Sequence, residues 1–398
     1  MAVDTLEQTL AQYESHSDFP LIQDISQISR MARIKQIGAQ LGWAIATGLL
    51  ANGLGIPVGW LLGPMMAGVI YVSMRQQAKP LPPFFMTSAK ALLGVASAVR
   101  FSPETLTLAI SYAVPVVFCI AITASLSLFY GYLLSRWSDV DQTTGILSFV
   151  PGMASTIVAL GEEMGADAVS IALLQYIRVI LVVLIIPALA KFLFAETAIS
   201  FDASLDLLSF SDVTIGIGDS CFNIALNMVV VTGCSILGVW AGQRLRLPAA
   251  GYLGPFVLGL GVLWLSPLTP SIPQWLFSMA LLFVGLSIGL KFDWKTARKL
   301  WKAVIIDIIL VLLLSLMCLG IGYGFHAMTQ VDTVTSVLGF TPGGIEAMIA
   351  TVMELGGDTG LVLAMQLTRM LLIILFAPGL ITFFASRKTQ EKPEKLPG

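Results

Sequence analysis

The sequence repeats itself once, because adding 191 to a residue number in the first half gives a matching residue in the second half. No insertion interrupts this register between residues 57 and 187. The two halves are therefore copies of one unit, and we expect them to fold in similar ways. The matched pairs include Pro57 and Pro248, Gly63 and Gly254, Pro64 and Pro255, Gly94 and Gly285, Pro151 and Pro342, Gly152 and Gly343, Glu163 and Glu354, Asp167 and Asp358, Gln175 and Gln366, Arg178 and Arg369, and Pro187 and Pro378.

The composition places this repeated unit in a membrane. The 398 residues are 56% hydrophobic and only 12% charged, with a mean hydropathy of +0.86. A soluble domain carries about 25% charged residues. Several apolar runs reach the roughly 20 residues that a helix needs to cross a bilayer. The sequence therefore predicts an all-α polytopic protein of the inner (plasma) membrane of the cell.

The same composition argues against nucleic acid binding and metal chemistry. The net charge of −2 and the pI near 5.7 provide no basic surface for nucleic acid. The four cysteines form no Cys-x-x-Cys pair, and the two histidines, His16 and His326, are far apart in the chain. Such a set does not make a copper or iron oxygenase centre, so we expect no metal, no cofactor and no enzyme activity.

Each half contains six apolar segments between polar ends. In the first half they are residues 38–55, 57–74, 83–100, 106–134, 143–161 and 168–190, and in the second half 222–243, 248–265, 273–290, 303–326, 334–352 and 359–385. The predicted domains are a polar cytosolic arm without a cleavable signal (1–37), membrane repeat 1 (38–195), a linker (196–221), membrane repeat 2 (222–387) and a cytosolic tail (388–398).

The fifth segment of each half differs from the others, because a Pro-Gly pair interrupts it at Pro151 and at Pro342. Each arm then has roughly 8–10 residues, which is too short to span a bilayer. Proline and glycine favour a break in the helix. We expect a re-entrant hairpin, with an unwound crossing helix as the alternative. In both cases, backbone without regular helix at this depth in the membrane must be buried in protein or line a cavity.

Positive charges near the segment ends favour the hairpin. With it, each half crosses the membrane five times, the second half is inverted, and Arg136, Arg244 and the C-terminal tail all face the cytosol. Lys191 and Arg100 are the exceptions. Six crossings in each half would instead place Arg244 on the outer side of the membrane. We therefore expect ten crossings with both termini cytoplasmic, and twelve crossings as the alternative.

Two arginines, Arg178 and Arg369, occupy equivalent positions near the middle of long apolar segments. An arginine at this depth costs about 2.5–3.5 kcal/mol on insertion scales, so each should face the interior and have a partner. Asp167 shares a helix face with Arg178 but lies about 16 Å away along the axis. The remaining partners are hairpin carbonyls, Glu346 or a bound anion. A permanent ion pair or carbonyl cap is the alternative to a role in binding solute.

Two carboxylates have no counterpart in the first half. Glu346 corresponds to Ser155, and Asp307, alone in an apolar segment, corresponds to Val116. Glu346 is our candidate for coupling to a proton or a cation, and a neutral side chain bonded to backbone is the alternative. Asp307 is a second candidate for an ion relay and could equally be a structural hydrogen-bonding group.

A further set of acidic residues follows the Pro-Gly pairs. We expect these residues at the returning ends of the hairpins and the starts of the next helices, where they complement the helix dipole. They are Glu162, Glu163, Asp167, Glu354 and Asp358.

The duplicated motifs resemble the AbrB-type duplicated membrane protein family. They are Pro-x-x-x-x-Leu-Gly-Pro near the start of each half and Pro-Gly-Gly/Met…Glu-x-Gly-x-Asp…Gln-x-x-Arg…Pro near its end, and the likeness covers residues 38–387. Met153 departs from the Pro-Gly-Gly pattern that the second half keeps. The resemblance implies kinship with the broad group of inverted-repeat transporters. Family labels such as ammonia monooxygenase or regulator have no support in these residues.

The sequence thus predicts a secondary transporter of a small anionic solute, a carboxylate or an amino acid, coupled to H+ or Na+. A membrane-embedded sensor that regulates gene expression through partners is the alternative. Besides the solute and the lipid bilayer, no partner is predicted, and a homodimer is left open. The predicted coupling residues are Glu346 and Asp307, and the two arginines would bind anionic groups of the solute or lock the hairpins. The predicted solute-binding residues are Pro151, Gly152, Ser155, Gln175, Arg178, Pro342, Gly343, Gly344, Gln366 and Arg369.

Overall fold

A computed structural model of the chain describes residues 20–75, 80–151, 154–194, 221–247, 249–265 and 272–373. Within these ranges every regular element is a helix. The helices are α2 (Pro20–Gly53), α3 (Gly59–Met74), α4 (Pro83–Val99), α5 (Pro103–Ser111), α6 (Ala113–Trp137), α7 (Gln142–Phe149), α8 (Ala154–Glu163), α9 (Ala168–Phe194), α10 (Cys221–Arg244), α11 (Ala250–Leu265), α12 (Gln274–Gly289), α13 (Trp294–Lys299), α14 (Trp301–Thr329), α15 (Thr333–Phe340), α16 (Ile345–Leu355) and a final helix, Thr359–Ile373.

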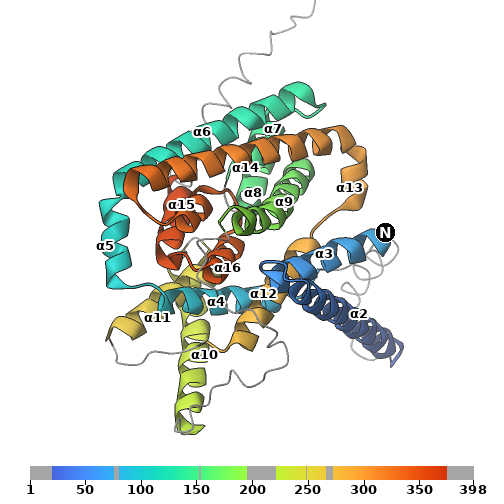
Figure 1. Ribbon diagram of the computed structural model, residues 1–398. Coiled ribbons are helices and arrows are strands. Elements are labelled where there is room, and N and C mark those ends of the chain that lie inside the picture. Colours follow the sequence, from blue (N-terminus) through green and yellow to red (C-terminus); the bar gives the residue numbers. More distant parts are fainter. Residues whose placement is uncertain are drawn as a thin grey trace, which may run out of the picture.

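The helices form two groups, which lie one above the other in Figure 1. In the glycine-packed group, α2, α3 and α4 pack with α10, α11 and α12. In the hairpin group, α6, α7, α8 and α9 pack with α14, α15 and α16. The two groups touch where α4 and α12 meet α16 and where α3 and α12 meet α9. Each group therefore takes the same part of the repeat from both halves.

Close helix contacts at glycine hold the glycine-packed group together. A β-carbon on Gly94 in α4 would overlap the carbonyl oxygen of Tyr252 in α11. A β-carbon on Gly285 in α12 would likewise overlap the carbonyl oxygen of Leu61 in α3. These two contacts match in the register of 191 residues, and each joins one half of the chain to the other. Small residues allow such close approach of helix backbones, which is typical of packing within membranes.

The fifth segment of each half folds as a helical hairpin. One helix ends before the Pro-Gly pair and the next begins after it, as α7 and α8 in the first half and α15 and α16 in the second. The hydroxyl oxygen of Thr144, at the start of α7, accepts a hydrogen bond from the backbone N–H of Asp167 at 3.0 Å, just beyond α8. Thr335 and Asp358 form the equivalent bond at 2.7 Å. Since the two ends of the segment meet, the chain turns back at the Pro-Gly pair.

Three of the described helices are long and apolar enough to cross a membrane, judged by length and composition: α6, α9 (as Ala168–Ala190) and α14. The helices α4 and α5, bent by 89° at their junction, pass the same test together. Shorter apolar helices are α3, α11, α12 and Thr359–Ile373. These helices indicate a membrane protein, as the composition predicts.

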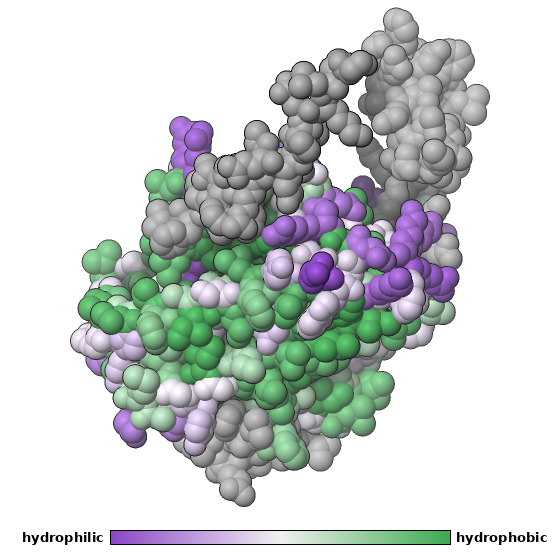
Figure 2. All heavy atoms as spheres, turned by 90° about the horizontal axis from the view of Figure 1, so that it is seen from above, coloured by the Kyte–Doolittle hydropathy of each residue, from purple (hydrophilic) through white to green (hydrophobic). Residues whose placement is uncertain are grey.

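The surface also has the character of a membrane protein. Val114 and Phe118 in α6 are 81% and 66% exposed, and Met328 in α14 is 80% exposed. Figure 2 shows apolar side chains over much of one face, with most of the strongly polar residues gathered on one side of it. Soluble monomers rarely expose so large an apolar surface, whereas lipid tails cover such a surface in a bilayer.

The predicted segments match the helices closely, with one correction. Residues 106–134 are predicted as one segment, but the structure has α5 and α6 with Tyr112 between them. Pro115 lacks the N–H that would bond the carbonyl of Ser111, which explains the break. α2 runs without interruption through residue 37, the predicted end of the arm. The tail (388–398), and the linker (196–221) except for its last residue, lie outside the described residues.

The glycine contacts give a test of the packing. Gly285→Ala places a methyl group against the backbone of α3, so we expect it to destabilise the protein by about 1–3 kcal/mol. Gly261 in α11 has no atom within 4 Å of an added β-carbon, and alanine there should raise stability by up to about 1 kcal/mol. Thermal unfolding of both purified variants in detergent measures the difference. Equal melting temperatures would contradict the proposed close contact.

Candidate functional site at the hairpin tips

The two hairpin tips are short stretches of extended backbone. Val150 follows α7 and Thr341 follows α15, and both have extended φ and ψ angles. The next residues, Pro151 and Pro342, are buried. The last carbonyls of a helix have no donors within the helix, and buried carbonyls need partners. Other side chains must therefore provide donors at each tip.

In the first half, α9 provides these donors. Arg178 is 4% exposed, and its Nη1 donates to the carbonyl oxygen of Phe149 at 3.0 Å and of Val150 at 3.5 Å. Gln175, one turn earlier, donates from Nε2 to the carbonyl oxygen of Leu147 at 3.0 Å. Both side chains thus bind the end of α7 and hold the hairpin tip against α9.

The second half repeats this arrangement. Arg369, 7% exposed, donates from Nη1 to the carbonyl oxygen of Thr341 at 3.0 Å, and its Nη2 donates to Oε1 of Gln366. Nε2 of Gln366 donates to the carbonyl oxygens of Leu338 and Thr341 at 3.0 and 3.2 Å. Of the partners considered for these arginines, the hairpin carbonyls are the ones that the structure shows.

Asp307 in α14 is a buried carboxylate that acts electrostatically on Arg178. It is 1% exposed, and Arg178 is the charged side chain that acts on it electrostatically. Nε of Arg178 and Oδ2 of Asp307 are both buried and have no hydrogen-bond partner among the described residues. Since an isolated charge is costly inside a membrane, we infer that Asp307 compensates the charge of Arg178.

Glu346 lies apart from the arginines, at the contact between the two helix groups. It sits in the first turn of α16, where Gly344 offers no side-chain cap. One of its carboxylate oxygens lies 2.9 Å from Nζ of Lys90 in α4. The side chain of Glu346 is 15% exposed, and that of Lys90 is 31% exposed. Glu346 thus has a lysine as its partner, whereas the alternative from the sequence was a neutral side chain bonded to backbone. Sequence reasoning missed Lys90, although its counterpart Leu281 shows that the halves differ here too.

Of the five acidic residues expected to cap helices, the two aspartates do so and Glu354 does not. Asp167 accepts hydrogen bonds from the N–H groups of Val169 and Ser170, and Asp358 accepts one from Leu361, so both cap the following helix as expected. The hydroxyl of Ser170 lowers the pKa of Asp167, which keeps this cap ionised. Glu354 instead accepts the N–H of Val58 at 2.6 Å, across the two helix groups.

The structure thus brings most of the predicted site residues together at the two tips. Gln175 and Arg178 meet one tip, and Gln366 and Arg369 meet the other. Gly343 and Gly344 are half-buried beside the second tip. Gly152 and the side chain of Ser155 lie outside the described residues.

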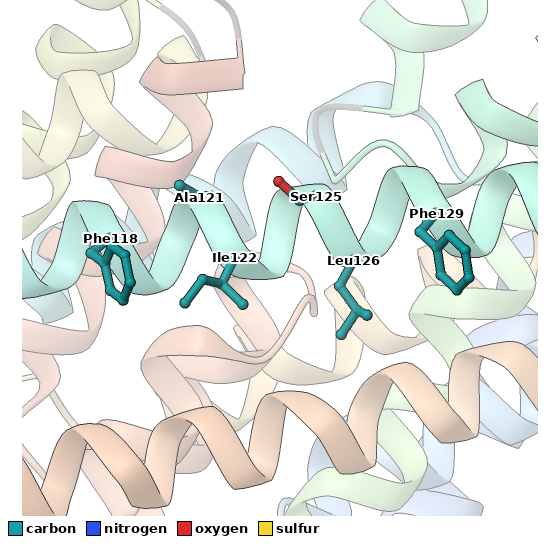
Figure 3. A pocket seen from close by; sticks show the side chains of 6 residues that line it. All are labelled: Phe118, Ala121, Ile122, Ser125, Leu126 and Phe129. Atoms are coloured by element: carbon teal, nitrogen blue, oxygen red, sulfur yellow. The ribbon is translucent and has the colours of Figure 1, made fainter.

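An open groove of about 470 Å³ lies elsewhere on the hairpin group (Figure 3). It is lined by Phe118, Ala121, Ile122, Ser125, Leu126 and Phe129, all from α6, and these side chains are mainly apolar. None of the predicted site residues lines it. We interpret this groove as part of the surface that faces lipid.

No three His, Cys, Asp or Glu side chains come together as metal ligands within the described part of the chain.

Comparison with known proteins connects this architecture to one family. The family model described as "Transition state regulatory protein AbrB" matches residues 23–385. A protein of Escherichia coli (strain K12), whose name describes it as a regulator, AbrB, is 29% identical over 348 residues, which are 87% of this chain and 95% of that protein. The uncharacterized protein YhjN of Bacillus subtilis (strain 168) is 24% identical over 365 residues, 88% of this chain and 93% of that protein. No solved structure matches.

The arrangement of Arg178 and Asp307 predicts a specific pattern of stabilities. Arg178→Leu removes the donor to the hairpin and leaves Asp307 uncompensated, so we expect a loss of about 3–5 kcal/mol. Adding Asp307→Leu should recover part of that loss, because the unpaired carboxylate is removed as well. Thermal unfolding in detergent gives the two values, with Arg244→Leu at an exposed site as the control. If the double variant is no more stable than Arg178→Leu, the two charges are not coupled.

Proposed function

The chain belongs to the AbrB family, and we propose that it is a secondary transporter for a small anionic solute such as a carboxylate or an amino acid. The pair of hairpins carries this proposal. Broken segments with extended tips are tolerated at membrane depth only where they are enclosed by protein or line a cavity. In secondary transporters, discontinuous helices of this kind form the solute site near the midplane.

We place the solute beside the tips of the two hairpins. Pro151, Pro342 and Gly343 would shape the backbone there, and Gln175 and Gln366 would line the site together with Gly152, Ser155 and Gly344. The hydrogen bonds of Arg178 and Arg369 to the tip carbonyls favour a locking role for the arginines over direct binding of the solute. Glu346 would couple transport to H+ or Na+, with Asp307 as the second candidate.

The proposed membrane topology is an inverted repeat. Each half would cross the bilayer five times, with its hairpin entering and returning on one side, so that the two halves have opposite orientations in the inner membrane. The return of each hairpin to its starting point supports an odd number of crossings per half. Both termini would then be cytoplasmic.

A sensor or regulator is the second candidate, because the name of the Escherichia coli relative describes a regulator. A sensor would use the same site to bind a solute but would not move it across the membrane. The N-terminal arm would then be the part that meets a signalling partner.

The topology can be tested with cysteine labelling. We expect a cysteine at Glu163 and a cysteine at Glu354, each the single accessible cysteine of its variant, to react with an impermeant thiol reagent from opposite sides of the membrane. Both positions are exposed, and Cys119, Cys234 and Cys318 are buried. The fourth cysteine, Cys221, is replaced by serine in both variants. Labelling of both positions from the same side would rule out the inverted repeat.

The transport activity can be tested in proteoliposomes with radiolabelled acetate, lactate and glutamate. We expect saturable uptake of at least one of these anions, driven by an inward gradient of H+ or Na+. Glu346→Gln should abolish accumulation driven by the gradient while exchange at equilibrium continues, because only the coupling step requires a titratable carboxyl. Gly261→Ala is the control and should transport normally. Binding without uptake in the wild type would favour the sensor.

A further inference from the structure

The ion pair between Lys90 and Glu346 joins the two helix groups. Lys90 belongs to α4 of the glycine-packed group, and Glu346 belongs to α16 of the hairpin group. Other polar contacts between the groups, among the described residues, include the bond from Val58 to Glu354 and the cation–π contact of Lys291 with Tyr176, at 5.3 Å from the ring centre. Of these three, only the Lys90–Glu346 contact is a salt bridge.

The fold itself does not require this pair. At the matching positions of the other half, Leu281 stands in place of Lys90 and Ser155 in place of Glu346. Leu281 is 5% exposed and packs in the apolar core, so the position that matches Lys90 carries no charge. A buried ion pair is often no more stable than a hydrophobic contact, because both charges lose their water. The pair is therefore an addition to one half, for which packing gives no reason.

The other cations of the site bind groups of the protein that are not carboxylates in direct contact. Arg178 and Arg369 donate to the hairpin carbonyls and cannot turn toward a solute without leaving those carbonyls buried and unpaired. Lys291 rests on the ring of Tyr176. Lys90 differs because it contacts a carboxylate directly, at 2.9 Å, and because nearly a third of its side chain is exposed. A carboxylate is also the chemical group of the proposed solute.

We propose that Lys90 is the residue that binds the carboxylate of the solute, and that Glu346 occupies its place when the solute is absent. This inference rests on the proposed transport function. Protonation of the Glu346 carboxyl breaks its ion pair and frees the Lys90 ammonium for the incoming anion. The proton comes from the side of the membrane from which the solute enters.

The charges balance in both states. With Glu346 ionised, it neutralises Lys90, and with Glu346 protonated, the anion of the solute neutralises Lys90. The site is therefore neutral before and after binding, which avoids an uncompensated charge within the membrane. Transport of one monoanion with one proton follows, and this movement is electrically silent.

The pH dependence has a definite sign. Binding requires protonated Glu346, so the affinity for the anion should rise as the pH falls and should fall by about tenfold per unit at higher pH. The charged and titratable groups that act on this pair are Lys291, Tyr252 in α11 and Tyr176 in α9, besides Lys90 and Glu346 themselves. Glu346→Gln has no carboxyl to protonate and should bind the anion with the same affinity at pH 6 and pH 8.

The experiment measures binding of acetate, lactate and glutamate to the purified full-length protein, from thermal stabilisation over a series of concentrations at pH 6 and pH 8. The variants are Glu346→Gln and the double variant Lys90→Leu with Glu346→Ser. The double variant takes the residues that the chain already uses in its other half, so it leaves no unpaired charge and should elute as a single species. We expect it to lose affinity by about tenfold to a hundredfold, as for loss of a charged hydrogen bond.

The outcomes separate this inference from the proposed function. If the wild type binds an anion and the double variant binds it equally well, Lys90 is not the binding residue, and the transport proposal stands. If Glu346→Gln keeps the pH dependence of the wild type, the exchange between Glu346 and solute is wrong. If the wild type binds and transports none of the three anions, the proposed function fails, and this inference fails with it. Uptake that responds to membrane potential would contradict the neutral exchange.

Discussion

Hydrogen bonds from two buried arginines to the ends of broken helices are the interaction on which the rest of this structure depends. A helix that stops inside an apolar environment leaves carbonyls that no water can reach. Arg178 and Arg369 provide donors to those carbonyls, and each is placed one turn after a glutamine that does the same. Without these side chains the Pro-Gly breaks would be too costly to bury. The helices α9 and Thr359–Ile373 thus support the hairpins in addition to forming part of the apolar bundle.

The two halves share this support but not the chemistry around it. Asp307, which we infer to compensate Arg178, has the uncharged Val116 as its counterpart in the register. Lys90 and Glu346 likewise have an apolar and a neutral counterpart. The duplicated residues therefore form the architecture, and the residues found in one half give the site its charges. A symmetric scaffold with an asymmetric site can hold a solute that is itself asymmetric.

Sequence reasoning reached the residues that the two halves share and missed one that they do not. The hairpins follow from Pro-Gly pairs in segments too short to cross twice, and the positions of the breaks agree with the ends of α7 and α15. The hairpin carbonyls were one of three possible partners for the arginines. The sequence could not select among them, because the spacing of residues along a helix does not show which backbone packs against that helix. Lys90 was missed because nothing in the sequence near it indicates a partner. Its partner lies in the other half of the chain, so only the fold brings the two together.

The reciprocal contacts at Gly94 and Gly285 bear on how the chain is made. The third helix of each half, α4 or α12, packs on the second helix of the other half, α11 or α3. The first half thus leaves the ribosome with two helix faces that have no partner until α11 and α12 have been synthesised. Neither half can complete its own packing, so the newly made protein depends on lipid or on the insertion machinery to cover these faces in the meantime. The same geometry implies that the first half of this chain, made alone, would lack the helices that cover these two faces.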